Sequence, residues 1–135
     1  MELTKIHFPT FTDPKGSLSF LEAEGHVPFP INRVYYIYDV PSNERRGFHA
    51  HKALKQVMFC IHGSCKIFLD DTVEQEIVSL TSPSEGLLID RPMWREMFDF
   101  SPDAVLMVLA SQLYDESDYI RNYEDFLAFV RGEGK

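Results

Sequence analysis

The stretch Arg46-Gly47-Phe48-His49-Ala50-His51 decides how this chain is interpreted. It places two histidines two residues apart in a segment with strand character, so both imidazoles are expected on one face of a sheet. Imidazoles change charge near neutral pH, and a pair in one small volume indicates either a metal site or proton transfer. The rest of the chain has to distinguish these two chemistries.

The composition is that of an ordinary globular protein. The chain has 135 residues, of which 44% are hydrophobic and 25% charged, and this predicts one domain over residues 1–135. A formal net charge of -8 with dispersed basic residues argues against nucleic-acid binding. We see no signal peptide and no apolar run long enough for a membrane span, so we expect a cytoplasmic protein in which Cys60 and Cys65 are buried thiols.

Short apolar runs rich in aromatic and β-branched residues recur at close spacing, which is typical of an antiparallel sandwich or barrel. Turn-forming residues separate them, for example His62-Gly63-Ser64 and Asp70-Asp71-Thr72. A further turn, Asp13-Pro14-Lys15-Gly16, places Lys15 beside the start of a strand. The runs cover residues 17–22, 31–39, 57–61, 64–69, 76–80, 86–89 and 104–110.

Near the C-terminus the spacing of apolar residues changes from the strand period to the helical one. Apolar positions between residues 117 and 131 follow a 3.6-residue stripe, which predicts one amphipathic helix. Ser117 or Asp115 would serve as its N-cap, and Gly132 would end it. The predicted fold is therefore mainly β, with a C-terminal helix bracing the β-structure.

The histidine pair resembles the first of two motifs of the metal-binding cupin barrels. Two of the four expected metal ligands are replaced, because Gln56 stands in place of a glutamate and Met97 in place of a histidine. An amide and a thioether are poor ligands for the divalent metals of such barrels. We therefore expect a cupin-type antiparallel β-barrel or jelly roll without a metal, its mouth lined by free imidazoles. The residues that match are His49, His51, Gly63, Gly86 and Pro92.

Longer sequence segments, which together span nearly the whole chain, resemble one group of cupins, the cupin-type sugar nucleotide 3,4-ketoisomerases. The resemblance implies an isomerase that moves the keto group of dTDP-4-keto-6-deoxyglucose from C4 to C3 by way of an enediol, without a cofactor. Such enzymes supply 3-amino-3,6-dideoxy sugars for surface glycans such as lipopolysaccharide or S-layer glycans, and relatives form homodimers. The segments that carry this resemblance are residues 33–39, 46–52, 63–65, 69–71, 92–97, 108–111 and 114–121.

The resemblance also implies roles for individual residues. His49 would move the carbon-bound proton between C3 and C4, and His51 would shuttle the proton between the C3 and C4 oxygens. Two bases with a pKa near neutrality suit these transfers. Tyr35 would orient the hexose, and Arg46 would hold a pyrophosphate oxygen or polarise the enediolate. On strict alternation Arg46 points away from the histidines, so its role requires either a bend before Gly47, which a glycine permits, or an extended reach of the side chain.

Two basic residues bear on the configuration at C4 of the product. Lys15 resembles the galacto-type branch of the family, whereas Arg95 resembles the gluco-type branch. Both are predicted to contact the substrate, and their conflict favours mixed or relaxed stereochemistry at C4. Trp94 or Phe98 is a candidate for stacking on thymine.

Two other classes of function stay open at this point. One is a metal-dependent cupin oxygenase or isomerase, which sensitivity to chelators would reveal. The other is a non-catalytic module that binds a nucleotide sugar, which would bind the ligand without forming product. The chain retains both bases and shows no attached effector segment, which favours the isomerase.

Overall fold

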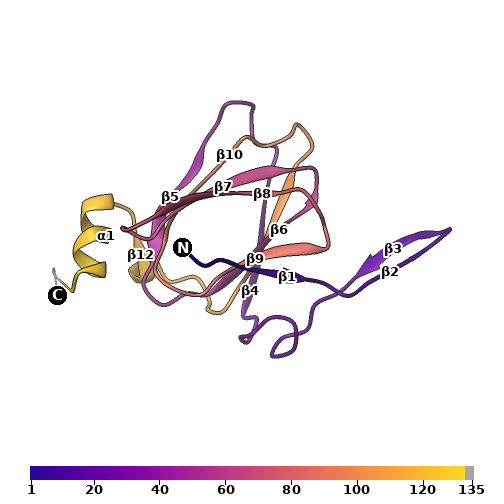
Figure 1. The fold of residues 1–135 in the computed structure, drawn as a ribbon, viewed down its shortest axis with the longest axis horizontal. Helices are drawn as coiled ribbons and strands as arrows, with labels where there is room; N and C mark the ends of the chain where they lie inside the picture. Colours follow the sequence, from indigo (N-terminus) through magenta and orange to yellow (C-terminus); the bar gives the residue numbers. More distant parts are fainter. Residues whose placement is uncertain (133–135) are drawn as a thin grey trace.

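The structure, a computed structural model, describes residues 1–132. Within this range two five-stranded antiparallel sheets face each other as a barrel, and a separate hairpin extends from it (Figure 1). The first sheet has the order β1 (Thr4–His7), β9 (Glu85–Ile89), β6 (Gln56–His62), β11 (Val105–Ala110) and β4 (Arg33–Tyr38). The second has the order β12 (Tyr119–Ile120), β5 (Arg46–His51), β10 (Trp94–Phe98), β7 (Cys65–Asp70) and β8 (Gln75–Leu80).

The strands bury two sets of side chains. Met58 and Cys60 on β6 belong to the core between the two sheets, whereas Val57 and Phe59 pack outside the barrel. This alternation explains why β6 is a continuous apolar run. Cys65 faces Cys60 with 3.5 Å between the two sulfur atoms, and both are buried free thiols, as predicted.

The first sheet is covered on its outside by the loop between residues 20 and 32. Val27 and Phe29 of this loop are buried against Phe59 and Leu109. The loop therefore seals one face of the barrel, so that the mouth is the route to the inward-facing side chains of β4 and β5.

The C-terminal helix is shorter than predicted. An isolated 3-10 turn, η1 (Glu116–Asp118), and strand β12 precede α1, which runs only over Tyr123–Val130. The predicted helix start was wrong because β12 pairs with β5 and withdraws Tyr119 and Ile120 from the helix. Asn122 caps α1 by accepting a hydrogen bond from the Asp125 backbone N–H at 3.0 Å.

The predicted helix and its C-terminal end at Gly132 are otherwise found. Gly132 has a φ of +76° and directly follows the C-cap residue Arg131. Phe126 anchors α1 in an outer cluster with Ala50, Trp94 and Ile120. Neither α1 nor η1, the helices of residues 1–132, is long and apolar enough to cross a membrane.

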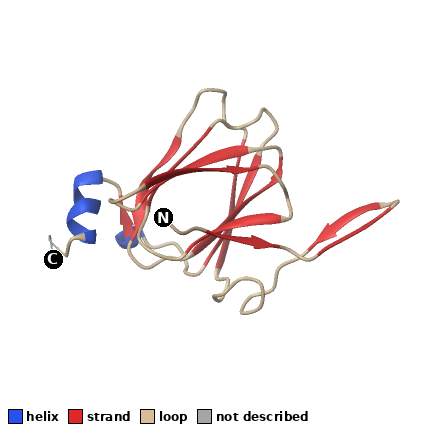
Figure 2. Ribbon diagram, in the orientation of Figure 1, coloured by secondary structure: helices blue, strands red, loops and turns tan. Residues whose placement is uncertain are grey.

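The seven predicted strand runs all contain strands, but the first is shortened to β3 (Gly16–Ser19). β3 pairs with β2 (Thr10–Asp13), and the two form an arm at the opposite end of the molecule from α1 (Figures 1 and 2). The arm exposes Phe11 and Leu18, which are 66% and 59% accessible. The pattern of apolar runs missed five strands that are short or mixed in polarity, β1, β2, β5, β10 and β12, of which β5 was predicted from the histidine motif instead.

Candidate active site

A β-bulge in β5 sets the geometry of the site. His49 lies opposite Arg95 on β10 and Gly47 lies opposite Glu96, so Phe48 is an extra residue between two consecutive partners. Gly47 and Phe48 have φ angles of +97° and +56°. The bulge supplies the bend that the sequence required, and it turns Arg46 to the same side of the strand as His49.

The two predicted histidines lie side by side. Their ring centroids are 4.9 Å apart and the rings are nearly perpendicular, at 84°. His49 Nδ1 lies 3.1 Å from the Gly47 carbonyl oxygen and His51 Nδ1 lies 3.0 Å from Asp118 Oδ2. The Gly47 carbonyl oxygen only accepts, so the neutral His49 ring carries its proton on Nδ1 and leaves Nε2 as the basic nitrogen. His51 Nε2 is buried and has no hydrogen-bond partner within residues 1–132.

The imidazoles are weaker bases than the sequence predicted. Burial, with a further contribution from the charge of Arg95, lowers the pKa of His49 from its ordinary value to about 4. The same two causes lower the pKa of His51 to about 2. The expectation of pKa values near neutrality was therefore wrong, because both rings are withdrawn from water beside a cation. At pH 7 both are neutral and able to accept a proton.

Arg95 lies at the base of this site and is almost fully buried, with 1% of its surface accessible. Its Nε donates to the Met93 carbonyl at 3.1 Å, and Nη1 donates to Gln56 Oε1. Gln56 Nε2 in turn donates to the Tyr35 hydroxyl at 2.8 Å. Burial lowers the pKa of Arg95 to about 10, so it is still a cation at pH 7. Burial also raises the pKa of Tyr35, which keeps its hydroxyl protonated.

The site does not fit the divalent metal that other cupin barrels hold. Gln56 Oε1 accepts from the Arg95 guanidinium, and His51 Nδ1 is occupied by Asp118. A buried guanidinium beside the imidazoles also repels a second cation. These contacts leave Nε2 of each histidine without the carboxylate and third imidazole that a stable divalent site requires.

A cavity of ≈ 360 Å³ opens above the histidines. It brings together three of the residues predicted for the site, Tyr35, Arg46 and His49, while His51 and Arg95 are buried beside them. Its full lining is Tyr35, Tyr36, Ile37, Arg46, Gly47, His49, Met97, Tyr119 and Arg121.

Sequence reasoning missed Tyr119. Its ring centroid lies 4.4 Å from that of His51 and 5.1 Å from that of His49, so it packs against both bases. Arg121 stacks on the same ring at 4.3 Å while pairing with Glu116. Tyr119 was missed because its segment was assigned to a helix, where it would have faced elsewhere.

Arg33 was also missed, although alternation with Tyr35 along β4 places both on the inner face. Arg33 stacks on Tyr35 at 5.2 Å, and its Nε is buried without a hydrogen-bond partner in the described residues. Neither Arg33, Arg46 nor Arg95 forms an ion pair with a carboxylate within residues 1–132. Three arginines without a carboxylate partner, two toward the mouth and Arg95 at the base, indicate that this acidic protein binds an anionic ligand here.

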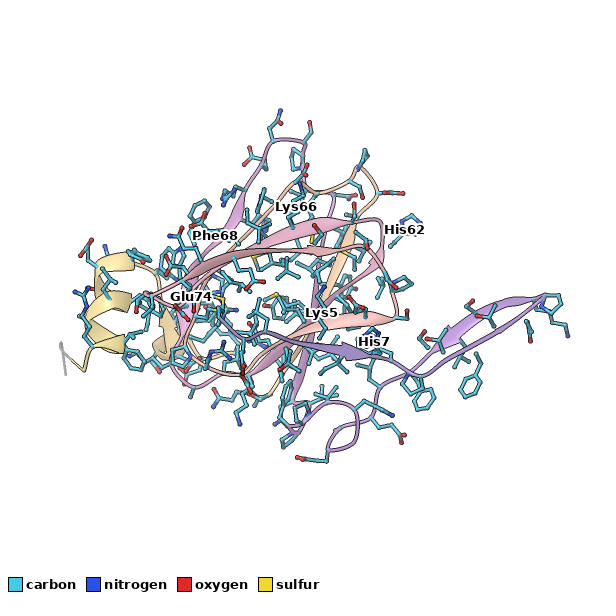
Figure 3. The ribbon with its side chains drawn as sticks, in the orientation of Figure 1. Lys5, His7, His62, Lys66, Phe68 and Glu74 are labelled. Atoms are coloured by element: carbon cyan, nitrogen blue, oxygen red, sulfur yellow. The ribbon has the colours of Figure 1, made fainter. Side chains whose placement is uncertain are left out.

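Three predicted site residues lie elsewhere. Lys15 is at the turn of the β2–β3 arm, which extends away from the barrel (Figure 1), and it does not line the cavity. Trp94 is directed to the outer face, where it packs against Tyr123 and donates to Glu96 at 2.8 Å. Phe98, four residues after Trp94 on the same strand, lies on the same outer face, so neither aromatic reaches a ligand in the barrel. Figure 3 likewise shows His7 and His62 at the periphery of the molecule.

The fold and the site together define a cupin-type barrel whose mouth holds two neutral imidazoles rather than a metal. The sequence matches the family model described as FdtA: WxcM-like, C-terminal, over residues 1–131. It is 48% identical over 130 residues to the TDP-4-oxo-6-deoxy-alpha-D-glucose-3,4-oxoisomerase of Aneurinibacillus thermoaerophilus, with 96% of this chain and 94% of that protein covered. The chain belongs to this family of sugar nucleotide 3,4-ketoisomerases.

Solved structures agree with this assignment. QdtA, a sugar 3,4-ketoisomerase from Thermoanaerobacterium thermosaccharolyticum in complex with TDP, superposes with a TM-score of 0.94 at 45% identity, covering 96% of this chain and 95% of that one. A variant of QdtA was solved in complex with TDP-4-keto-6-deoxyglucose. WlaRB, a TDP-quinovose 3,4-ketoisomerase from Campylobacter jejuni, has a TM-score of 0.88 at 48% identity, covering 93% and 96% of the two chains. The predicted cupin-type fold is confirmed.

Proposed function

We propose that this protein converts dTDP-4-keto-6-deoxyglucose to a dTDP-3-keto-6-deoxyhexose. The observation that carries the proposal is the pair of adjacent imidazoles, His49 and His51, whose Nδ1 atoms lie 3.1 and 3.0 Å from oxygen atoms. The reaction requires one proton to move between carbons and one between oxygens, and two bases can divide this work. Membership of the ketoisomerase family supports the same substrate and reaction.

The chemistry follows from the acidity of the carbon next to a ketone. The C4 ketone acidifies the proton on C3, and His49 removes it to give an enediolate. His51 transfers the proton of the C3 hydroxyl to the C4 oxygen, and His49 returns its proton to C4. A ketone at C3 and a hydroxyl at C4 result, with no net oxidation. The buried cation of Arg95 stabilises the negative charge of the intermediate.

The unpaired arginines at the mouth suit the diphosphate of the substrate. Arg46 lines the cavity directly, and Arg33 stacks between the rings of Tyr35 and Tyr114 at 5.2 and 5.6 Å. Guanidinium groups bind phosphate oxygens through paired hydrogen bonds, and an anion there would also satisfy the buried Arg33 Nε. The hexose would then lie deeper, between Tyr35 and the histidines.

NMR analysis of the product tests the proposal directly. Purified protein incubated with dTDP-4-keto-6-deoxyglucose, without added metal, should yield the 3-keto isomer. His49→Asn and His51→Asn should each lower turnover at least about 100-fold while TDP still binds. The matched control is His62→Asn, because His62 is exposed outside the barrel. Binding of the dTDP-sugar with no product would instead support a non-catalytic module.

We also propose a homodimer formed through the β2–β3 arm. An isolated two-stranded hairpin is marginally stable in water, and this one exposes Phe11 and Leu18. Strand β4, at the edge of its sheet, offers unpaired backbone groups to an incoming strand. Docking of the arm on a second copy would cover these side chains. It would also carry Lys15 to the second molecule, where it could contact that molecule's substrate.

Light scattering tests the arm. The wild-type protein should have twice the 15.6 kDa mass of one chain, and a variant combining Phe11→Asp with Leu18→Asp should have the mass of one. Val73→Asp is the control, because Val73 is 86% accessible in a loop away from the arm. A wild-type protein with the mass of a single chain would overturn the dimer.

Three finer features complete the proposal. The C4 configuration is relaxed, since Lys15 and Arg95 resemble different branches, and the NMR product analysis measures it. The enzyme acts in the cytoplasm, which suits its two free thiols, Cys60 and Cys65. Its product supplies a 3-aminated deoxysugar for a surface glycan such as lipopolysaccharide or an S-layer glycan. Residues 1–135 act as one domain.

A further inference from the structure

Asp118 is a nearly buried residue that contacts His51 and takes no part in the proton transfers proposed above. Its Oδ2 lies 3.0 Å from His51 Nδ1, and its side chain is 10% accessible. It is the last residue of η1, directly before β12, where Tyr119 pairs with His51. The register of β12 on β5 therefore brings the Asp118 carboxylate next to the His51 ring.

The Asp118 carboxylate is fixed in place by the backbone that follows β5. Ala53 N–H donates to Oδ1 at 2.8 Å, and Leu54 N–H donates to Oδ2 at 3.3 Å. The backbone carbonyl of Asp118 also accepts from Lys52 N–H at 3.0 Å. The carboxylate therefore cannot turn away from His51 without breaking its bonds to two successive backbone N–H groups, and the Lys52 bond holds the Asp118 backbone in place.

We propose that Asp118 is a positioning residue that holds His51 in the tautomer with the proton on Nδ1, so that the buried Nε2 is the basic atom presented to the substrate oxygens. This inference rests on the proposed isomerase function and deepens it. An ionised carboxylate only accepts hydrogen bonds, so the alternative tautomer would set two lone pairs against each other at 3.0 Å. The ring orientation is fixed by the same bond.

The surroundings of His51 give Asp118 a second effect. Arg95, Arg33 and Arg121 all act on the ring from β10, β4 and the segment after β12, and their charges disfavour the imidazolium. His49 from β5 has the same influence, while Tyr119 from β12 packs on the ring. The Asp118 carboxylate, in direct contact, offsets these charges at the moment His51 holds a proton during transfer.

His49 provides an internal comparison. Its Nδ1 is held by the backbone carbonyl of Gly47, which no side-chain substitution removes. A change at Asp118 therefore alters the tautomer of His51 alone. In Asp118→Asn the amide nitrogen placed toward His51 would donate to Nδ1 and move the ring proton to Nε2, where it blocks the base.

The test begins with the ligand-free wild-type protein. ¹⁵N NMR of its histidine rings, assigned with His51→Asn, should show His51 protonated on Nδ1. In Asp118→Asn the proton should move to Nε2. Asp103→Asn is the matched control, since it makes the same change beside the exposed His62. A wild-type His51 protonated on Nε2 would overturn the proposal whether or not any variant folds.

Kinetics provide the second measurement. Asp118→Asn should lower kcat by about 10² to 10⁴-fold, with little change in KM or in the affinity for TDP. Combined with His51→Asn it should add no further loss, because it acts through His51. A kcat within threefold of wild type would sink the proposal. A wild-type protein that forms no product refutes the isomerase function instead, and the tautomer measurement still stands on its own.

Discussion

Acidification should destabilise this protein between pH 7 and 5, and the histidine pair sets the size of the loss. In the unfolded chain a histidine takes up a proton near its ordinary pKa of 6.5, whereas burial holds the pKa of His49 at about 4 in the folded protein. Above pH 6.5 both states are neutral and stability is unaffected. Between 6.5 and 4 only the unfolded state binds the proton, so stability decreases as the pH falls.

The magnitude follows from these two pKa values. Each pKa unit corresponds to about 1.36 kcal/mol, so His49 alone accounts for about 3 kcal/mol once the pH is below 4. From pH 7 to 5 the loss due to His49 is about 2 kcal/mol. His51, whose pKa is lowered further, adds a loss of similar size in that interval.

Urea unfolding at pH 7, 6 and 5 measures this loss. His49→Asn should lose about 2 kcal/mol less than wild type between pH 7 and 5, because the variant has no ring to protonate. His62→Asn is the control, since it removes a histidine whose side chain is 66% accessible outside the barrel. Parallel curves for wild type and His49→Asn would show that His49 is not held neutral by burial, and the account of the site given above would be wrong.

Other perturbations have equally defined outcomes. Gly47→Ala should lower the free energy of unfolding by about 3 kcal/mol, measured with denaturant. Its φ is +97°, and the new Cβ would lie 2.8 Å from Met97 Sδ and 2.9 Å from the Arg95 backbone oxygen. Gly25→Ala is the control, because the nearest atom to its new Cβ is 3.5 Å away. Phe126→Ala should lower the free energy of unfolding by about 3 to 5 kcal/mol, because Phe126 is fully buried. Phe129→Ala, on the same helix but 39% exposed, should lower it by less than about 1 kcal/mol. Arg33→Met should raise the Kd for TDP about 10- to 100-fold in calorimetry, and unchanged affinity would remove Arg33 from the diphosphate site. Between pH 6 and 8 kcat/KM should not vary more than about twofold, since both bases are already neutral; an acid limb near pH 6.5 would contradict the lowered pKa values.

Much of the fold could be predicted because its determinants are local. Alternation along the strands and turn residues between them are both properties of short segments. The helix start could not be found this way, because Tyr119 and Ile120 continue the helical stripe and are withdrawn from it by pairing with β5. That pairing joins residues about 70 positions apart in the chain, which no local pattern records.

The site residues likewise fall into those that a local sequence pattern predicts and those that depend on pairing between distant segments. The histidine pair follows from spacing within one strand, and Arg33 could have been found from its alternation with Tyr35. Asp118, in contrast, reaches His51 through the β12 register, and strict alternation placed Arg46 on the wrong face because one extra residue in the bulge reverses it. The lowered pKa values depend on burial beside Arg95, which comes from a different strand.

The bond between Arg95 and Gln56 has a consequence for redesigning this barrel. Restoring a glutamate at position 56 would not recreate a metal ligand, since the neighbouring guanidinium would capture the new carboxylate as a buried ion pair. Removing Arg95 alone would leave the Gln56 oxygen unpaired, and replacing Met97 by histidine alone would supply a third imidazole beside a guanidinium that repels the metal. Restoring the four-ligand metal site of other cupin barrels therefore requires coordinated changes at positions 56, 95 and 97.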